Sequence, residues 1–244
     1  MNEFQDRATD FVRTNYPSAK AAFLGGSTAS GSATHTSDLD ILVMLPGEWE
    51  QVAFVETTRH QGQLVEAFVY GTSGLHQWRE KGRSASRPVL DRLIAEGIVL
   101  IQSDLAEMLV KESSEALAAG PSAPDPDQLL ARRYSLSALI DDVTETVSPG
   151  EQIVVMATAW REASELALMS QNRWLGTGKW LLRELRRSGD DFGLAAWIDE
   201  GGSDPTTLTT RCQKVLDSVG GYLQEGALRG TKPSALHTRP LHAG

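Results

Sequence analysis

The spacing of apolar residues divides the chain into two halves with different patterns. Before residue 118, short apolar runs rich in β-branched and aromatic residues predict strands, and apolar residues three and four positions apart predict helices. In chain order these are a helix at 4–14, strands at 21–26, 38–45 and 63–71, and a helix followed by a strand within 87–103. Helices and strands that alternate in this way favour an α/β or α+β domain with a mixed sheet.

The second half of the chain has a purely helical pattern. It begins after "AAGPSAPDPDQ" (118–128), a stretch with three prolines and few apolar residues, which we interpret as a linker or domain boundary. Amphipathic helices are predicted at 127–147, 151–175, 179–189, 191–201 and 205–226. Because such helices bury their apolar stripes on one another, we expect an all-α helical bundle. The domains are therefore predicted at 1–118 and 127–226, followed by a disordered tail at 227–244.

Composition and charge narrow the class of protein. The formal net charge of −9 over 244 residues argues against general nucleic-acid binding, for which basic patches are typical. Cys212 is the single cysteine, which excludes an intrachain disulfide and a cysteine-based zinc site. The charged N-terminal segment lacks the apolar core of a signal peptide, and no apolar run is long enough to span a membrane. We therefore expect a cytoplasmic protein without membrane contact; the oligomeric state stays open.

Candidate chemistry lies in "FLGGSTASGSATHTSDLDILV", from Phe23 to Val43. Residues two apart on a strand share a face, so Asp38 and Asp40 are expected to project together. The alternate positions, expected to face a core, are Leu39, Ile41 and Val43. Two such carboxylates can hold Mg²⁺ ions about 3.5–4 Å apart. Glu66 offers a third carboxylate in an otherwise apolar strand, where an unpaired charge is costly. If that strand lies beside 38–45, the three carboxylates converge.

The small residues before the aspartates suit a phosphate group. Gly25 and Gly26 allow a ligand to approach the backbone closely, and Ser27 can donate a hydroxyl hydrogen bond. A turn of exposed N–H groups would bind phosphates. Metal on one side and amide donors on the other would hold a nucleoside triphosphate.

This stretch is similar to the signature of the DNA polymerase β-like nucleotidyltransferase superfamily, in which Gly-Ser is followed about ten residues later by Ser-Asp-x-Asp. The matching positions are Gly26, Ser27, Ser37, Asp38 and Asp40. Glu66 corresponds to the third carboxylate of the superfamily, whereas Ser30 stands where an arginine is typical. The similarity covers about residues 20–70. It implies that ATP is a substrate, that Gly26, Ser27 and Ser37 bind it, and that Asp38, Asp40 and Glu66 are catalytic and hold two Mg²⁺ ions.

A second resemblance lies in the helical half. "NRWLGTGKWLLREL" (172–185) looks like the C-terminal domain of aminoglycoside adenylyltransferases of the streptomycin/spectinomycin or kanamycin type. This resemblance implies that Lys179, in the Thr-Gly-Lys turn, approaches the triphosphate, and that the protein acts in antibiotic resistance. A Walker P-loop is rejected because Arg173 occupies the position of its first glycine and Trp180 follows the lysine.

Each motif also has a purely structural interpretation. Asp38 and Asp40 could form a solvated strand end, Glu66 could face water on an edge strand, and Lys179 could be a solvated residue at a helix start. Acidic positions in the helical half could form a cleft for a polycation or simply solvated helix faces. These positions are Asp141, Asp142, Glu145, Glu162 and Glu165.

The leading hypothesis is an Mg²⁺-dependent nucleotidyltransferase that moves AMP from ATP to a hydroxyl of a small molecule. Glu66 would accept the hydroxyl proton or help to hold the metal. The best candidate acceptor is an aminoglycoside-type antibiotic, a cationic molecule. The alternatives are a toxin-like nucleotidyltransferase that modifies tRNA or a protein, and a catalytically silent homologue that binds nucleotide.

Overall fold

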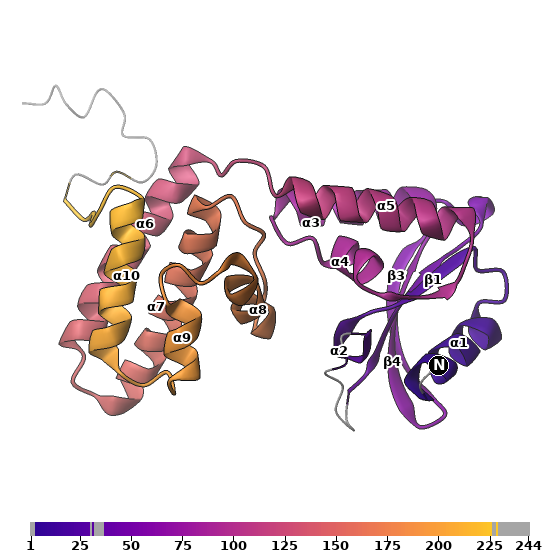
Figure 1. Ribbon diagram of the computed structural model, residues 1–244, viewed down its shortest axis with the longest axis horizontal. Helices are drawn as coiled ribbons and strands as arrows, with labels where there is room; N and C mark the ends of the chain where they lie inside the picture. Colours follow the sequence, from indigo (N-terminus) through magenta and orange to yellow (C-terminus); the bar gives the residue numbers. More distant parts are fainter. Residues whose placement is uncertain (1–2, 30, 32–36, 226–227, 229–244) are drawn as a thin grey trace, which may run out of the picture. The chain divides into compact units, whose positions relative to one another are not determined.

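The structure is a computed structural model that describes residues 3–29, 31, 37–225 and 228 (Figure 1). The chain divides into two compact units, Met1–Ser122 and Ala123–Gly244. The first is a mixed sheet with helices and the second is helical, so the predicted fold class is confirmed. Apart from residue 228, the predicted tail lies outside the described residues. Within the described residues, no helix combines the length and apolar character that a membrane crossing requires.

The first unit is built on a five-stranded sheet with the order β3-β4-β2-β1-β5. The strands are β1 (Ala21–Leu24), β2 (Leu39–Met44), β3 (Ala53–His60), β4 (Gln63–Tyr70) and β5 (Ile98–Ile101). β2 and β4 run parallel, and the other neighbouring strands pair antiparallel. β3 was not predicted from the sequence. It is an edge strand that is exposed along nearly its whole length, so it lacks the alternation that marks a half-buried strand.

Helices cover both faces of this sheet (Figure 1). They are α1 (Glu3–Asn15), α2 (Gly26–Ala29), α3 (Thr72–Ser84), α4 (Val89–Ala95) and α5 (Asp104–Ala119), with a short 3-10 turn η1 (Gly47–Trp49). On one face, Phe11 of α1 packs in a cluster with Ile41 of β2. On the other, Leu93 of α4 and Leu109 of α5 share a cluster with Leu42 of β2. α3 and α5 were not among the predicted elements.

The central strand β2 separates the two cores by the alternation of its side chains. Leu39, Ile41 and Val43 face the α1 side, as predicted, and all three are fully buried. Leu42 and Met44 face the side covered by α4 and α5. Asp40 alternates with Leu42 and Met44, so it lies on the face of the sheet covered by α4 and α5. It is the second residue of β2, near the start of the strand.

The second unit contains five helices among its described residues. They are α6 (Pro126–Glu145), α7 (Pro149–Ser170), α8 (Lys179–Ser188), α9 (Leu194–Asp199) and α10 (Pro205–Ser218). Leu136, Leu166, Trp197 and Cys212 lie in their common core, which confirms the predicted helical bundle. α10 ends eight residues earlier than predicted, because Gly220 and its neighbour adopt positive φ angles, which end a helix.

Candidate functional site

The structure brings the three predicted carboxylates together. Oxygen atoms of Asp38, Asp40 and Glu66 all lie within 4.8 Å of one another, and each residue is partly exposed. The cause is strand register: β2 and β4 are parallel neighbours, and Asp40 is paired directly with Glu66. Residues paired in this way point to the same face of the sheet. The predicted convergence is confirmed, and the catalytic role of these residues remains a prediction.

The chain before β2 is fastened to the strand that carries the aspartates. The Gly25 N–H donates a hydrogen bond to the Asp40 carbonyl at 2.8 Å. The Thr28 hydroxyl donates to the Asp38 carbonyl at 3.2 Å, and its side chain is 4% exposed. Both bonds go to backbone carbonyls, so they fix the turn after β1 against the start of β2.

Gly26 lies in contact with the acidic cluster. Its φ angle is +67°, a left-handed conformation that glycine adopts without a steric penalty. A Cβ atom at this position would stand 1.8 Å from the Asp40 Oδ2 atom. Glycine is therefore required at this position for two reasons. The backbone has a positive φ angle, and the Asp40 carboxylate occupies the space that a Cβ atom would need. This geometry is compatible with the predicted approach of a ligand to the backbone.

Two residues that the sequence analysis missed support the start of β2. Gln63, at the first position of β4, donates from its side-chain amide to the Ser37 carbonyl. Arg7 of α1 donates to the Gln63 Oε1 atom at 3.1 Å. These contacts link α1 and β4 to the residue just before Asp38. No motif marks them, because they act on a backbone carbonyl that any residue could provide.

Electrostatics favour a cation at the cluster. Two unit charges 4.8 Å apart repel by roughly 3.5 kcal/mol at an effective dielectric constant of about 20. A cation bound between Asp38, Asp40 and Glu66 would turn this repulsion into attraction. The donors are carboxylate oxygens only, the set that hard divalent cations such as Mg²⁺ prefer. The residues present therefore fit the expected metal.

The remaining predicted ligands of ATP are placed less completely. The Ser27 side chain lies outside the described residues, and so does Ser30, which stands at the superfamily's arginine position. Lys179 is exposed at the first position of α8 and belongs to the second compact unit. Its approach to a triphosphate remains a prediction.

The acidic positions proposed for a polycation cleft are partly occupied by partners within the second unit. Arg132 contacts Glu162 at 3.0 Å and Glu165 at 2.6 Å. Burial raises the pKa of Glu162, and Glu165 is only 3% exposed. Asp141 accepts a hydrogen bond from the Tyr222 hydroxyl. These three carboxylates therefore stabilise the helical bundle internally.

Comparison with known proteins agrees with the geometry of the first unit. The family model for the nucleotidyltransferase domain matches residues 6–81, a range that contains Gly26 and all three carboxylates. The chain thus contains a nucleotidyltransferase domain of the polymerase β-like class with an acidic carboxylate cluster. The family implies a nucleoside triphosphate as a substrate. It gives no specific support for the aminoglycoside adenylyltransferases or for a role in antibiotic resistance.

A solved structure of a nucleotidyltransferase-like protein from Exiguobacterium sibiricum 255-15 is similar, with 14% sequence identity and a TM-score of 0.41. The similarity covers 87% of this chain and 74% of that chain. The search of curated proteins found no match.

Proposed function

We propose that this protein is an Mg²⁺-dependent nucleotidyltransferase that moves AMP from ATP to a hydroxyl group of a small molecule. The observation that carries the proposal is the convergence of Asp38, Asp40 and Glu66 within 4.8 Å, beside a glycine that leaves room for the Asp40 carboxylate. The match of residues 6–81 to the nucleotidyltransferase domain supports the same reaction class.

The carboxylates would hold the metal. Asp38 and Asp40 would bind two Mg²⁺ ions, with Glu66 as a further ligand on the side of the acceptor. When bound, Mg²⁺ supplies neutralisation of the triphosphate charge and makes the attacking oxygen easier to deprotonate. The fixed register of β2 and β4 supports this assignment, because it holds the ligands in place before any ion arrives.

The residues of the chain would then bind the nucleotide and move one proton. The backbone at Gly26, with Ser27 and Ser37, would bind the phosphates, and the resemblance in residues 172–185 suggests Lys179 as a further phosphate ligand. Glu66 accepts the proton of the acceptor hydroxyl. The hydroxyl oxygen forms a bond to the α-phosphorus, the bond from that phosphorus to the bridging oxygen breaks, and pyrophosphate leaves with the electron pair.

The acceptor suggested by the resemblance in residues 172–185 is an aminoglycoside. An acidic surface would support a cationic acceptor of this kind. The ion pairs of Glu162 and Glu165 with Arg132 weaken that support, since carboxylates already paired attract a polycation less. An aminoglycoside therefore belongs in the test panel as one acceptor class among several.

The test is mass spectrometry after incubation of the protein with ATP, Mg²⁺ and a panel of hydroxylated small molecules. A gain of one AMP unit on a panel member is expected, and it should disappear with Asp40→Asn. Asp6→Asn on the exposed face of α1 is the matched control and should keep full activity. Transfer by Asp40→Asn at the wild-type rate would disprove the metal assignment. In a parallel incubation with labelled ATP and cell extract, label found only on tRNA or protein would replace the small-molecule acceptor by a macromolecule.

A further inference from the structure

The first unit contains a cavity of about 410 Å³ on the sheet face that also carries the carboxylates. This volume lies in the range typical of small-molecule sites. Its floor is formed by Val55 of β3 with Phe68 and Tyr70 of β4, and one wall by Trp78 of α3. We call this cavity the β3–α3 pocket. This pocket could not be predicted from the sequence, because neither β3 nor α3 shows a clear apolar period.

Strand register places the floor of the β3–α3 pocket next to Glu66. Phe68 follows Glu66 by two residues on β4, so the two side chains share a face and lie about 7 Å apart along the strand. Val55 on β3 is paired with Phe68, directly beyond the pair formed by Thr57 and Glu66. The pocket therefore begins one pair of residues away from the acidic cluster.

The order of the strands places the β3–α3 pocket and Gly26 on opposite sides of the acidic cluster. Across the sheet, the sequence of features is the β3–α3 pocket on β3 and β4, Glu66 on β4, Asp40 on β2, and Gly26 after β1. In the proposed function, Gly26 binds the phosphates and Glu66 takes the acceptor proton. The pocket is thus on the acceptor side of Glu66, away from the nucleotide phosphates.

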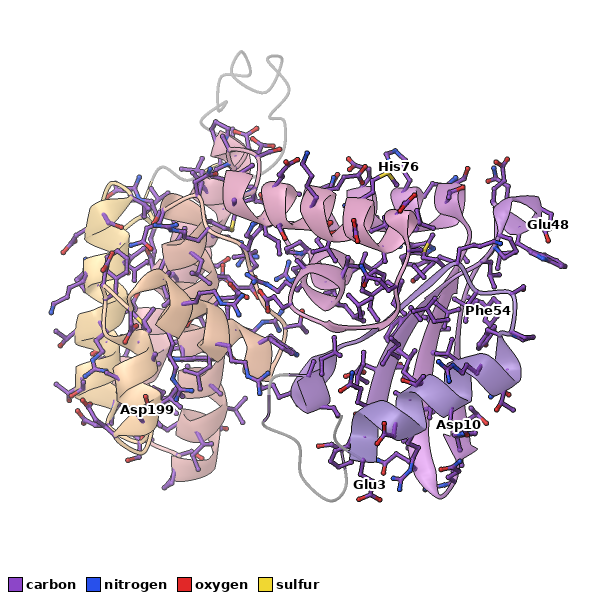
Figure 2. The ribbon with its side chains drawn as sticks, turned by 45° about the vertical axis from the view of Figure 1, so that its right-hand side comes forward. Glu3, Asp10, Glu48, Phe54, His76 and Asp199 are labelled. Carbon is purple, nitrogen blue, oxygen red and sulfur yellow. The ribbon has the colours of Figure 1, made fainter. Side chains whose placement is uncertain are left out.

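Several apolar side chains around this pocket are exposed to solvent. Val55 is 48% exposed, Trp78 is 46% exposed and Val89 is 61% exposed. Burial of such surface by an apolar ligand is favourable at roughly 25 cal/mol per Å². Figure 2 labels Phe54, the neighbour of Val55 on β3, at the surface of the same unit. An aromatic or otherwise apolar body would fill this lining well, and a polyhydroxylated polycation would leave it poorly covered.

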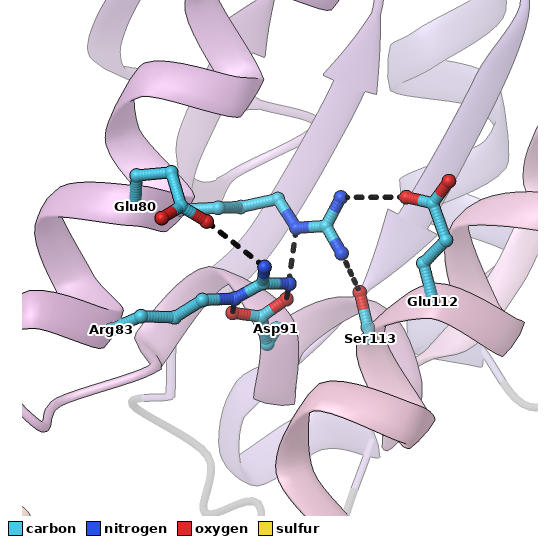
Figure 3. Close-up of polar contacts among 6 residues, drawn as sticks. Glu80, Arg83, Asp91, Glu112 and Ser113 are labelled. Carbon is cyan, nitrogen blue, oxygen red and sulfur yellow. Dashed lines mark hydrogen bonds and ion pairs between the residues drawn. The ribbon is translucent and has the colours of Figure 1, made fainter. Parts of the chain in front are cut away.

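The Arg79 and Asp91 side chains also line the pocket, and they are already paired with each other. Asp91 of α4 is fully buried and accepts hydrogen bonds from Arg79 at 2.8 Å and from Arg83 at 2.8 and 3.0 Å (Figure 3). Arg83 also contacts Glu80, and Arg79 contacts Glu112 at 3.1 Å. This network of ion pairs holds α3, α4 and α5 together. Because Arg79 and Arg83 are already paired with carboxylates, we do not assign them to the ligand.

Lys81 gives the mouth of the pocket a positive charge. Its ammonium group lies 4.4 Å from the centre of the Trp78 ring, in a cation–π contact. Among the residues that the structure describes, no acidic side chain forms an ion pair with Lys81. Arg87 also lines the pocket. The Lys81 ammonium group, in a chain of net charge −9, favours an anionic group on the ligand and disfavours a polycation.

We propose that the β3–α3 pocket binds the acceptor, and that the acceptor is a hydroxylated molecule with an aromatic or other apolar body and an anionic group. This inference rests on the proposed function, because it takes Glu66 as the proton acceptor. The apolar body lies over Phe68 and Val55, the anion lies at Lys81, and the hydroxyl reaches Glu66.

The first experiment tests the pocket without nucleotide. The probe is 8-anilinonaphthalene-1-sulfonate, an aromatic anion whose fluorescence rises on apolar binding. Val55→Glu should weaken its binding at least about tenfold, because a carboxylate is placed among apolar groups. The matched control is Thr58→Glu, a position that is also exposed and lies on the opposite face of β3. Lys81→Gln should weaken the binding several-fold, whereas Lys111→Gln on α5 should not. Equal binding by Val55→Glu and Thr58→Glu would overturn the pocket assignment.

The second experiment tests the acceptor class with ATP and Mg²⁺. Nucleotide transfer to 4-hydroxyphenylacetate is compared with transfer to kanamycin. We expect the aryl acid to be modified, with Val55→Glu raising its KM at least about tenfold and leaving kcat within about twofold. Transfer to kanamycin alone, or a KM that is insensitive to Val55→Glu, would overturn the inference. If wild-type protein binds no ATP with Mg²⁺, the proposed function fails, and loss of probe binding in Val55→Glu then supports the pocket by itself.

Discussion

Replacement of Gly26 by alanine is expected to disable the site with little loss of folding. The added Cβ atom would stand 1.8 Å from the Asp40 Oδ2 atom, and contacts of Cβ atoms below 3.0 Å essentially never occur. Either the Asp40 carboxylate or the turn after β1 must therefore move by roughly 1.2 Å. A misplacement of about 1 Å at a reacting centre can cost about a hundredfold in rate.

The stability cost of the same substitution comes mainly from the backbone. Alanine at a φ angle of +67° is disfavoured by about 1–2 kcal/mol relative to glycine. Gly62→Ala is the matched control, because Gly62 in the turn between β3 and β4 has a φ angle of +81° and no described atom lies within 4 Å of its added Cβ. Both variants should lose about 1–2 kcal/mol of unfolding free energy, and only Gly26→Ala should lose activity.

The assay combines urea unfolding with Mg²⁺-dependent pyrophosphate release from ATP in the presence of a hydroxylated acceptor that the wild-type protein modifies. Gly26→Ala is expected to reduce the rate about a hundredfold, while Gly62→Ala stays within a few-fold of wild type. A Gly26→Ala variant as active as Gly62→Ala would refute the argument that the closeness of Gly26 to Asp40 positions the carboxylate.

Three further predictions follow from other contacts. Asp91→Ala should lower the free energy of unfolding, measured in urea, by about 3–5 kcal/mol, because it removes the fully buried carboxylate that pairs with both Arg79 and Arg83; a loss below about 1 kcal/mol would contradict this. Burial raises the pKa of the Cys212 thiol to about 12, so a disulfide reagent at pH 8 should label it only after unfolding, and rapid stoichiometric labelling of native protein would count against the buried placement. Gln63→Ala removes the support of the Ser37 carbonyl and should lower nucleotide transfer about tenfold at a stability cost of about 1 kcal/mol; unchanged transfer would exclude a positioning role.

The core of the site could be predicted because it depends on local spacing. Asp38 and Asp40 are two residues apart at the start of a strand, and the period of a strand alone puts them on one face. Glu66 could be predicted as a site residue because it is a charged residue in an otherwise apolar strand, where an unpaired charge is costly. The sequence could not show that β2 and β4 are neighbours in register, because strand pairing is set by the whole sheet.

Other features depend on contacts that leave no local pattern. β3 is an edge strand exposed on both faces, and α3 contains two glycines and few apolar residues, so neither shows a clear period. The pocket between them was therefore hidden. The sequence predicts a role for Gly26 in the close approach of a ligand to the backbone. Its contact with the Asp40 carboxylate could be seen only in the structure.

In the proposed function, Asp38, Asp40 and Glu66 form a metal site for a nucleoside triphosphate. Calorimetric titration of ATP into the protein, with and without Mg²⁺, tests it most directly, with Asp40→Asn as the variant and circular dichroism as the check on folding. We predict ATP binding that requires Mg²⁺ and that Asp40→Asn abolishes in a folded protein. ATP binding that is independent of Mg²⁺, or equally strong in Asp40→Asn, would contradict the account.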